Sequence, residues 1–391
     1  MLNTALSPWP SFTQEEADAV SKVLLSNKVN YWTGSECREF EKEFAAFAGT
    51  QYAVALSNGT LALDVALKAM GIGAGDDVIV TSRTFLASAS CIVTAGANPV
   101  FADVDLNSQN ISAETVKAAL TPNTKAVIVV HLAGMPAEMD GIMDLAKEHD
   151  LWVIEDCAQA HGAKYKGKSV GSIGHVGAWS FCQDKIMTTG GEGGMVTTND
   201  KELWSKMWSY KDHGKSYDAV YHREHAPGFR WLHESFGTNW RMMEMQAVIG
   251  RIQLKRMPEW TARRQAHAAK LAESLGKFAS IRLIEVADYI KHAQYKFYAF
   301  VKPEHLKEGW TRDRIVNELN ARKVPCYQGS CSEVYLEKAF DNTPWRPKER
   351  LKNAVELGDT SLMFLVHPTL TDDEIAFCKE HIEAVLAQAT A

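Results

Sequence analysis

Short apolar runs alternate with amphipathic stretches over the first half of the chain. DVIVTS, KAVIVVH, LWVIED and VGAWSFC have the length and β-branched content of buried strands. Between them, SNGTLALDVALKAM and EMDGIMDLAKEHD carry apolar residues at helical spacing. Two helices are expected before these, one opened by a capping box from Thr13 to Glu16 and one with Cys37, Phe40 and Phe44 on one face. The alternation predicts an α/β fold, with a mostly parallel central sheet covered by helices on both faces.

The alternation stops at residues 211–238, which are polar and rich in histidine and arginine. Such a stretch predicts a long loop, and long loops in compact domains are usually functional or disordered. Helical spacing returns in NWRMMEMQAVIGRIQLKRM, and Pro258 directly after it is expected to kink or interrupt the helix. Beyond this point, the strand-like runs YKFYAFV and SLMFLV lie among helical segments. We therefore expect a large domain over residues 1–250 and a smaller α+β domain over residues 251–391.

Composition excludes several classes of protein. The 391 residues are 46% hydrophobic and 23% charged, which is ordinary for a globular protein. The net charge of −6 does not favour nucleic acid or an anionic membrane as a partner. No apolar run approaches the ~20 residues of a membrane span, and the first residues are not typical of a signal peptide. Seven scattered cysteines favour a reducing compartment, so we expect a cytoplasmic protein.

Neither of two pairs of metal-binding side chains predicts a metal site. Cys326 and Cys331 are the closest cysteines, but they lack the tight spacing of a zinc pair. His222 and His225 are three residues apart in the polar loop, with no further ligand beside them. We expect no metal.

The glycine-rich stretch GIGAGDD, from Gly71 to Asp77, superficially resembles a dinucleotide-binding loop. That fingerprint needs a strand before it and a helix after it. Here a predicted helix precedes and a predicted strand follows. The stretch is therefore interpreted as a helix end and a turn, and a nicotinamide oxidoreductase is not favoured.

The stretch SNGT, from Ser57 to Thr60, opens a predicted helix. Free backbone N–H groups and the helix dipole favour an anion at such an end. Gly59 would let a phosphate approach the backbone, and Thr60 offers a hydroxyl. An ordinary helix cap explains the same residues, so the stretch alone does not distinguish a phosphate site from a simple cap.

Asp156 in VIEDCAQAHG ends a predicted buried strand, at the edge where open α/β sheets bind ligands. A carboxylate there is costly unless it meets a cation or strong donors, although it could also cap the next helix. Gln159 and His161 follow on the same turn. A lone histidine of this kind is more often structural than catalytic.

Lys185 in WSFCQDKIMTTGGEGG also follows a predicted strand, with Ser180 just before it and four glycines after it. Alone, it would be interpreted as a surface lysine. An anion cradle, a carboxylate and a lysine at one sheet edge are together what pyridoxal 5'-phosphate (PLP) needs for its phosphate, ring nitrogen and aldehyde. Phe85, after the strand DVIVTS, offers an aromatic face for the ring, or else packs in the core.

These residues resemble the DegT/StrS family of PLP-dependent sugar aminotransferases, which have the aspartate-aminotransferase type I fold. The resemblance runs from about residue 8 to residue 385. It is carried by motifs that occur together in order, namely SNGTLALDVAL, TSRTFLASA, EDCAQAHGA, SFCQDKIMTTGGEGG, GTNWRMMEMQA and HPTLTDDEI.

The resemblance implies a role for each matching residue. Lys185 would form the Schiff base with PLP, Asp156 would pair with the pyridine nitrogen, and Gln159 would hydrogen-bond the ring hydroxyl. Phe85 would stack on the ring. The remaining cofactor contacts are to the phosphate, from Gly59, Thr60, Ser180 and, reaching in from the neighbouring subunit, Asn239. The last contact implies a homodimer with shared active sites.

The identity of residue 185 also bears on the reaction. Family members that dehydrate keto-sugars carry histidine there, whereas this chain has lysine. The resemblance therefore favours ping-pong transfer of an amino group from L-glutamate to a keto-sugar, as in polysaccharide or lipopolysaccharide biosynthesis. A PLP-dependent dehydratase and a catalytically silent PLP-binding regulator remain alternatives.

The sugar is less well defined. Nucleotide-linked keto-sugars are the commonest substrates of the family, but a free or acidic sugar stays open. This chain departs from the commoner family pattern in VPCYQGSCSEVYLEKAF and in YHREHAPGFRWLHE. Candidate substrate contacts are His161, Arg223, Arg230 and Gln328, because cationic and polar groups suit a diphosphate or a carboxylate.

Overall fold

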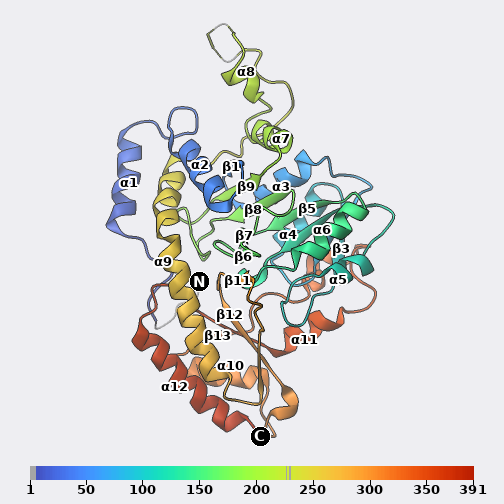
Figure 1. Cartoon of the computed structure of the whole chain (residues 1–391), viewed down its shortest axis with the longest axis vertical. Coiled ribbons are helices and arrows are strands. Elements are labelled where there is room, and N and C mark those ends of the chain that lie inside the picture. Colours follow the sequence, from blue (N-terminus) through green and yellow to red (C-terminus); the bar gives the residue numbers. More distant parts are fainter. Residues whose placement is uncertain (1–5, 226, 229) are drawn as a thin grey trace.

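The computed structural model describes residues 6–225, 227–228 and 230–391. Residues 1–5, where the sequence predicts no signal peptide, and residues 226 and 229 of the predicted loop lie outside this description. Figure 1 shows a large sheet between helices and a smaller sheet below it. The helices are α1 (Gln14–Leu25), α2 (Glu36–Ala48), α3 (Gly59–Ala69), α4 (Ala87–Thr94), α5 (Ala113–Ala118), α6 (Met139–Glu148), α7 (Lys201–Lys211), α8 (Tyr217–Tyr221), α9 (Glu244–Leu275), α10 (Arg312–Ala321), α11 (Lys352–Thr360) and α12 (Asp372–Ala389).

The large sheet has the strand order β1-β9-β8-β5-β4-β2-β3. From β8 to β3 all neighbouring strands are parallel, and β9 is antiparallel to both of its neighbours. The prediction of a mostly parallel sheet is therefore confirmed. The strands of the chain are β1 (Tyr52–Leu56), β2 (Asp77–Thr81), β3 (Asn98–Ala102), β4 (Thr124–Val130), β5 (Trp152–Asp156), β6 (Lys164–Tyr165), β7 (Lys168–Ser169), β8 (Val176–Ser180), β9 (Gly194–Thr198), β10 (Ile281–Leu283), β11 (Ile290–Lys291), β12 (Phe297–Val301), β13 (Cys326–Tyr327) and β14 (Ser361–Phe364).

Helices bury both faces of the large sheet. Val78 and Val80 of β2 pack in an apolar cluster with residues of α2, α3 and α4. Ile79 lies between them in sequence and packs on the opposite face, in a second cluster with residues of α5 and α6. Full burial of each such side chain stabilises the fold by about 1.5–3 kcal/mol, which explains why these strands are apolar throughout rather than alternating.

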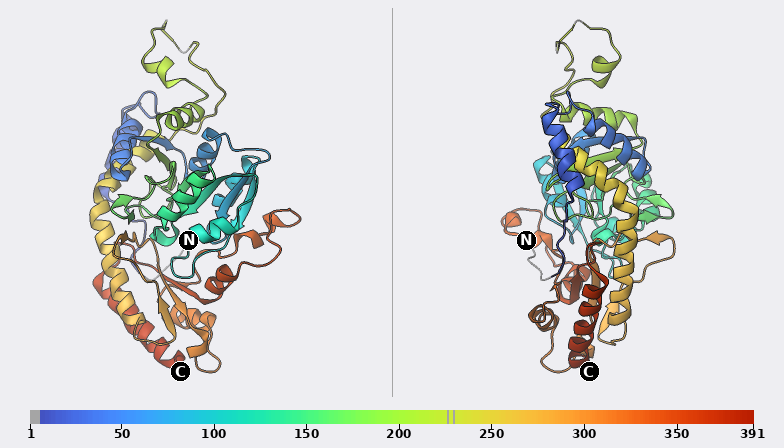
Figure 2. Two further views of the ribbon diagram at one scale, coloured as in Figure 1. Left: turned by 45° about the vertical axis from the view of Figure 1, so that its right-hand side comes forward. Right: turned by 90° about the vertical axis from the view of Figure 1, so that its left-hand side faces the viewer.

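The smaller sheet, β10-β12-β14-β13, is antiparallel and packs against α10, α12 and the last turns of α9. Helix α9 is 32 residues long and passes beside both sheets (Figures 1 and 2). It continues through Pro258, because Met257 and Trp260 are buried in the core and hold the helix on both sides of the proline. The expected domain boundary near residue 250 falls within this helix.

The polar stretch after α7 contains one short helix, α8, and projects from the body of the molecule beyond α7 (Figures 1 and 2). The helix predicted from Asn239 begins later, at Glu244. Residues 239–241, where the helix was predicted to begin, instead form isolated β-bridges, between Asn239 and Asp212 and between Arg241 and Leu56.

A smaller expectation, on the glycine-rich stretch after α3, is also met. Gly71 follows α3 in the left-handed conformation, with φ of +75°, and the N–H of Ile72 reaches back to the carbonyl of Leu67. GIGAGDD thus ends a helix and opens a turn, as predicted. Among the described residues no helix combines the length and apolarity that a membrane crossing requires.

Candidate active site

Two polar residues end neighbouring parallel strands. Asp156 is the last residue of β5 and pairs in register with Ala178 of β8, which ends two residues later at Ser180. Because both strands are parallel, their carboxyl ends meet at the same edge of the sheet, where ligands of open α/β sheets bind. The structure therefore brings Asp156 and Ser180 together as the sequence predicts.

The first turn of α3 packs directly on Ser180. A Cβ atom added to Gly59 would lie 2.5 Å from the Cβ of Ser180, so only glycine fits without a shift. Asn58 caps the helix by accepting the N–H of Leu61 at 3.0 Å. The first N–H groups of a helix have no partner within the helix, so a helix start beside the Ser180 hydroxyl is suited to a phosphate.

The Asp156 side chain is 6% exposed and keeps room for one more donor. Its Oδ2 accepts the hydroxyl of Ser88 at 2.8 Å, and its Oδ1 accepts the N–H of Ala158 at 3.1 Å. These two bonds fix the carboxylate plane, and a carboxylate has about four acceptor positions. A protonated ring nitrogen is the kind of partner that would fill such a position.

Gln159 is oriented by one backbone contact. Its side-chain oxygen accepts the N–H of Ala133 at 2.8 Å, and the residue is 8% exposed. With the oxygen engaged, the amide NH2 group remains as a donor. A donor at this place fits the predicted contact to a ring hydroxyl.

Lys185 is half-buried and is held from two sides. Its backbone carbonyl accepts the indole N–H of Trp9 at 2.9 Å. Its Nζ lies 5.3 Å from the centre of the Tyr295 ring, in a cation–π contact. Sequence reasoning missed both aromatic residues, because they lie in the N-terminal segment and just before β12, far from Lys185 in the chain.

Two more cations lie near Lys185 and were also missed. The Nζ of Lys296 is 4.7 Å from the centre of the same Tyr295 ring. Burial lowers the pKa of Lys296 to about 8, and although Asp184 opposes this shift, the charges of Arg264 and Lys185 add to it. The neighbourhood of the candidate catalytic lysine is thus electropositive, which no local pattern in the sequence signals.

Phe85 is 71% exposed near the end of the β2–α4 connection. An exposed aromatic ring beside a polar sheet edge suits either a ligand face or a subunit contact. Its stacking on a cofactor ring stays a prediction. Thr60, also exposed, stays a predicted phosphate contact.

His161 lies in the core rather than at the sheet edge. It is completely buried, and its ring centre is 5.2 Å from Trp179 and 5.5 Å from Phe181. Neither ring nitrogen has a hydrogen-bond partner among the residues that the structure describes. Burial, reinforced by the charges of Lys185 and Arg264, lowers its pKa to about 3, so the ring is neutral. The sequence suggested that His161 contacts the substrate, but the buried ring has no exposed surface for such a contact.

Among the described residues, the other predicted substrate contacts form no hydrogen bond or ion pair with Lys185, and each lies on another segment of the chain. Arg223 pairs with Asp218 and Glu234 on the projecting segment, and Arg230 is exposed on the same segment. Gln328 donates to Asp313 beside the smaller sheet. Their contact with a substrate stays a prediction, as does that of the exposed Asn239 with a phosphate of the neighbouring subunit.

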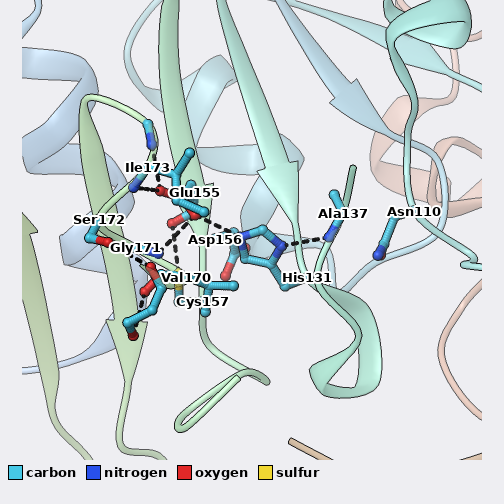
Figure 3. Close-up of polar contacts among 12 residues, drawn as sticks. Asn110, His131, Ala137, Glu155, Asp156, Cys157, Val170, Gly171, Ser172 and Ile173 are labelled. Carbon is cyan, nitrogen blue, oxygen red and sulfur yellow. Dashed lines mark hydrogen bonds and ion pairs between the residues drawn. The ribbon is translucent and has the colours of Figure 1, made fainter. Parts of the chain in front are cut away.

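The strand end that carries Asp156 is braced by a buried polar group, shown in Figure 3. The side chains of His131 and Glu155 point toward each other, with 3.0 Å between Nε2 and Oε2. Nδ1 of His131 accepts the N–H of Ala137, so Nε2 carries the proton that Glu155 accepts. Three backbone N–H groups complete the contacts of Glu155, from Gly171, Ile173 and Gly174.

This group also has the composition of a metal site, since Cys157 joins His131 and Glu155 with ligand atoms within 4.8 Å of one another. The contacts argue against that use, because both nitrogens of His131 are engaged. Burial raises the pKa of the Cys157 thiol well above its usual value, so it remains protonated and is a poor ligand. The group is better explained as a buried network that fixes the end of β5.

The residues at this edge fit PLP. They offer a tight phosphate cradle at Gly59 and Ser180, a spare carboxylate position on Asp156, an amide donor on Gln159 and the amine of Lys185.

Comparisons with known proteins agree with this chemistry. The family model described as the DegT/DnrJ/EryC1/StrS aminotransferase family matches residues 10–383. An aminotransferase of Psychrobacter cryohalolentis has a crystal structure 64% identical in sequence, covering 98% of this chain and 99% of its own, with a TM-score of 0.97. DesV of S. venezuelae, solved in complex with a ketimine intermediate, is 32% identical over 95% of this chain and 94% of its own, with a TM-score of 0.85.

A third relative carries a substrate in its name. The UDP-N-acetyl-3-dehydro-alpha-D-glucosamine 3-aminotransferase of Acidithiobacillus ferrooxidans is 41% identical over 363 residues, which are 91% of this chain and 90% of the relative.

Proposed function

Because the chain belongs to the DegT/DnrJ/EryC1/StrS aminotransferase family and is a PLP-dependent sugar aminotransferase, we propose that its amino donor is L-glutamate and its acceptor a nucleotide-linked keto-sugar. The relative that acts on a UDP-linked sugar supports the acceptor, since it covers nearly the whole chain. Lysine at position 185 supports transamination over dehydration. The product would enter polysaccharide biosynthesis.

The observation that carries the proposal is the packing of the first turn of α3 on Ser180, at the end of the strand next to Asp156. Gln159 follows Asp156 in the chain, and Lys185 follows Ser180. The Nζ of Lys185 would hold the aldehyde carbon of PLP, and the Asp156 carboxylate its ring nitrogen. Gln159 would donate to the ring hydroxyl. The α3 N-terminus and Ser180 would bind the phosphate.

When bound, PLP supplies an electron sink for the electron pair left on the donor's α-carbon after its proton is removed. Lys185 Nζ, once free as a neutral amine, accepts that proton and returns it one carbon away. Asp156 keeps a proton on the ring nitrogen by offering a negative oxygen to it. Trp9 would keep the lysine near this path by holding its backbone carbonyl, and the Tyr295 ring lies 5.3 Å from Nζ.

We further propose a cytoplasmic homodimer in which the projecting segment reaches the partner's site. The segment exposes two large aromatic residues, Trp231 at 91% and Phe236 at 99%, which is unusual for a surface that faces only water. In a dimer, Arg223, Arg230 and Asn239 would face the neighbouring cofactor and sugar. All seven cysteines are free thiols, as suits a reducing compartment.

The decisive experiment is an absorbance spectrum of the PLP-loaded protein before and after excess L-glutamate, without sugar. We expect a visible band from lysine-bound PLP that is lost on adding glutamate and replaced by near-ultraviolet absorbance. The variant Lys185→Ala should lack the visible band, while Lys291→Ala, at an exposed lysine on β11, should retain it. A wild-type band unmoved by glutamate would contradict the proposed donor.

The acceptor is tested separately by competition. A nucleoside diphosphate should compete with the sugar substrate if the sugar is nucleotide-linked. No competition by UDP, GDP or dTDP at millimolar concentration would instead favour a free or acidic keto-sugar.

A further inference from the structure

Three cationic side chains from distant parts of the chain surround Tyr295. The Nζ atoms of Lys185 and Lys296 lie 5.3 Å and 4.7 Å from the centre of its ring. Nη1 of Arg264, from α9, donates to the carbonyl oxygen of Tyr295 at 3.3 Å. We call Lys185, Arg264 and Lys296 the cation cluster.

The cation cluster has little negative charge to balance it. Nε and Nη2 of Arg264 are buried without a hydrogen-bond partner among the described residues, although the residue is 1% exposed. Asp184 is the carboxylate whose negative charge acts on both lysines. It also accepts a hydrogen bond from the hydroxyl of Tyr295. None of the ion pairs formed among the described residues includes Lys185, Arg264 or Lys296.

Uncompensated charge of one sign raises the free energy of a partly buried site, so the cluster favours an anion that comes from outside the chain. Lys296 and Lys185 are only partly buried and can reach a ligand. Arg264 is buried, so it acts on the ligand through its charge and not by direct contact. The cofactor phosphate is already accounted for by the α3 N-terminus and Ser180. The anion of the cluster is therefore a different one.

We propose that Lys296, supported by the charge of Arg264, binds a substrate carboxylate beside Lys185. The inference rests on the proposed function, in which Lys185 takes the proton from the donor's α-carbon. The α-carboxylate is bonded to that carbon, so it must lie close to Lys185 Nζ whenever the proton moves. Such a carboxylate could come from the amino acid donor or from an acidic keto-sugar. The donor is favoured, because its α-carboxylate is bonded to the carbon from which Lys185 takes the proton.

The test compares Lys296→Met with Lys296→Arg, which keeps the charge, and with Lys291→Met, which removes an exposed lysine outside the cluster. Lys296→Gln is measured beside Lys296→Met as a second neutral variant. Binding of glutarate, a dicarboxylate without an amine, to the PLP-loaded protein is measured by calorimetry. The dependence of visible-band loss on L-glutamate concentration is measured in parallel.

We expect both neutral variants to keep the visible band and to bind glutarate and L-glutamate about tenfold more weakly, as for loss of a charge-assisted contact. The limiting rate of band loss should change much less. Lys296→Arg should recover most of the affinity, and Lys291→Met should match the wild type.

D-glucuronate serves as the second probe. Weakening of D-glucuronate alone would assign the carboxylate to the sugar and keep the site. Unchanged affinity for glutarate, L-glutamate and D-glucuronate in both neutral variants, with the visible band intact, would overturn the inference. Failure of the proposed function itself looks different, because the wild-type band would then not respond to L-glutamate.

Discussion

The indole nitrogen of Trp9 donates to the carbonyl oxygen of Lys185 at 2.9 Å, although 176 residues separate the two in the chain. The Trp9 ring is itself held by aromatic and cationic neighbours. It meets Trp260 edge-on with ring centres 5.0 Å apart, lies parallel to His367, and carries the guanidinium of Arg264 over its face. The N-terminal segment thus fixes the backbone from which Lys185, the candidate catalytic lysine, extends.

Replacing Trp9 by phenylalanine should therefore slow amino transfer more than it destabilises the protein. Trp9→Phe keeps most of the ring packing and removes the N–H donor, with a loss of about 1 kcal/mol in unfolding free energy. The lysine backbone becomes less well placed, and we expect the rate of band loss with saturating L-glutamate to fall about tenfold.

A matched control is Trp345→Phe, which removes a similar indole bond to the side chain of Asn98 at 3.1 Å, on the opposite part of the large sheet. It should show a comparable stability loss by chemical denaturation and an unchanged rate. Equal rates for the two variants would refute the positioning role of Trp9.

Gly59→Ala should weaken cofactor binding because the new methyl group would meet Ser180. The Cβ would lie 2.5 Å from the Cβ of Ser180 and 2.9 Å from its Oγ, so one side of the phosphate cradle must move. We expect a PLP dissociation constant raised at least about tenfold and a stability loss of about 1–3 kcal/mol. Both are measured by fluorescence titration and chemical denaturation.

The control for this substitution is Gly73→Ala, where the nearest atom to an added Cβ is the carbonyl oxygen of Ala95 at 3.7 Å. This is ordinary van der Waals contact, so PLP affinity and stability should both stay close to wild type. Unchanged PLP affinity in Gly59→Ala would show that the cradle is not where the phosphate binds.

The sequence is sufficient for the parts of the site that follow one strand each. Asp156, Ser180 and Lys185 come after apolar runs, and parallel strands place all such residues at one edge. The phosphate cradle follows in the same way from a glycine at a helix start. Local patterns therefore predict the sheet, which is confirmed, and name the candidate cofactor residues, whose roles stay predictions.

The rest depends on packing between distant segments. Trp9, Arg264, Tyr295 and Lys296 come from the N-terminal segment, α9 and the residues before β12, and none has a local pattern that marks it. His161 shows the converse, since its place after Asp156 suggested a substrate contact. The chain turns it inward, where it is fully buried beside Trp179 and Phe181.

Carboxylate binding should weaken as the pH rises toward and past the pKa of Lys296. Burial lowers this pKa to about 8, so the side chain is charged below that value and neutral above it. Since the neutral form binds about tenfold more weakly, glutarate affinity is expected to fall about threefold between pH 6.5 and pH 8.5. Calorimetry across this range checks the prediction.

One variant separates the titration of Lys296 from that of the other titratable and charged groups that face it. They come from several elements and are Asp184, Lys185, Arg264 and His367. Lys296→Arg leaves all of them in place and stays charged over the whole range, so its glutarate affinity should be flat. A fall in affinity that persists in Lys296→Arg would assign the titration to another group.

The buried imidazole of His161 should make the protein less stable in mild acid. Its pKa is about 3 in the folded chain against 6.5 for an exposed histidine, because burial and two nearby cations oppose a further charge. Below pH 6.5 the unfolded chain therefore binds a proton that the folded chain does not. Folding stability falls with decreasing pH, by up to about 1.4 kcal/mol per pH unit for this residue.

His161→Leu removes that proton uptake and replaces two unpartnered nitrogens by an apolar side chain among aromatic rings. The variant should be at least as stable as wild type at pH 7, and its stability should decline less steeply between pH 6 and pH 4. His149→Gln, at an exposed histidine, leaves the slope unchanged. The slopes come from chemical denaturation at each pH, and identical slopes for His161→Leu and wild type would mean that the ring takes up its proton without unfolding.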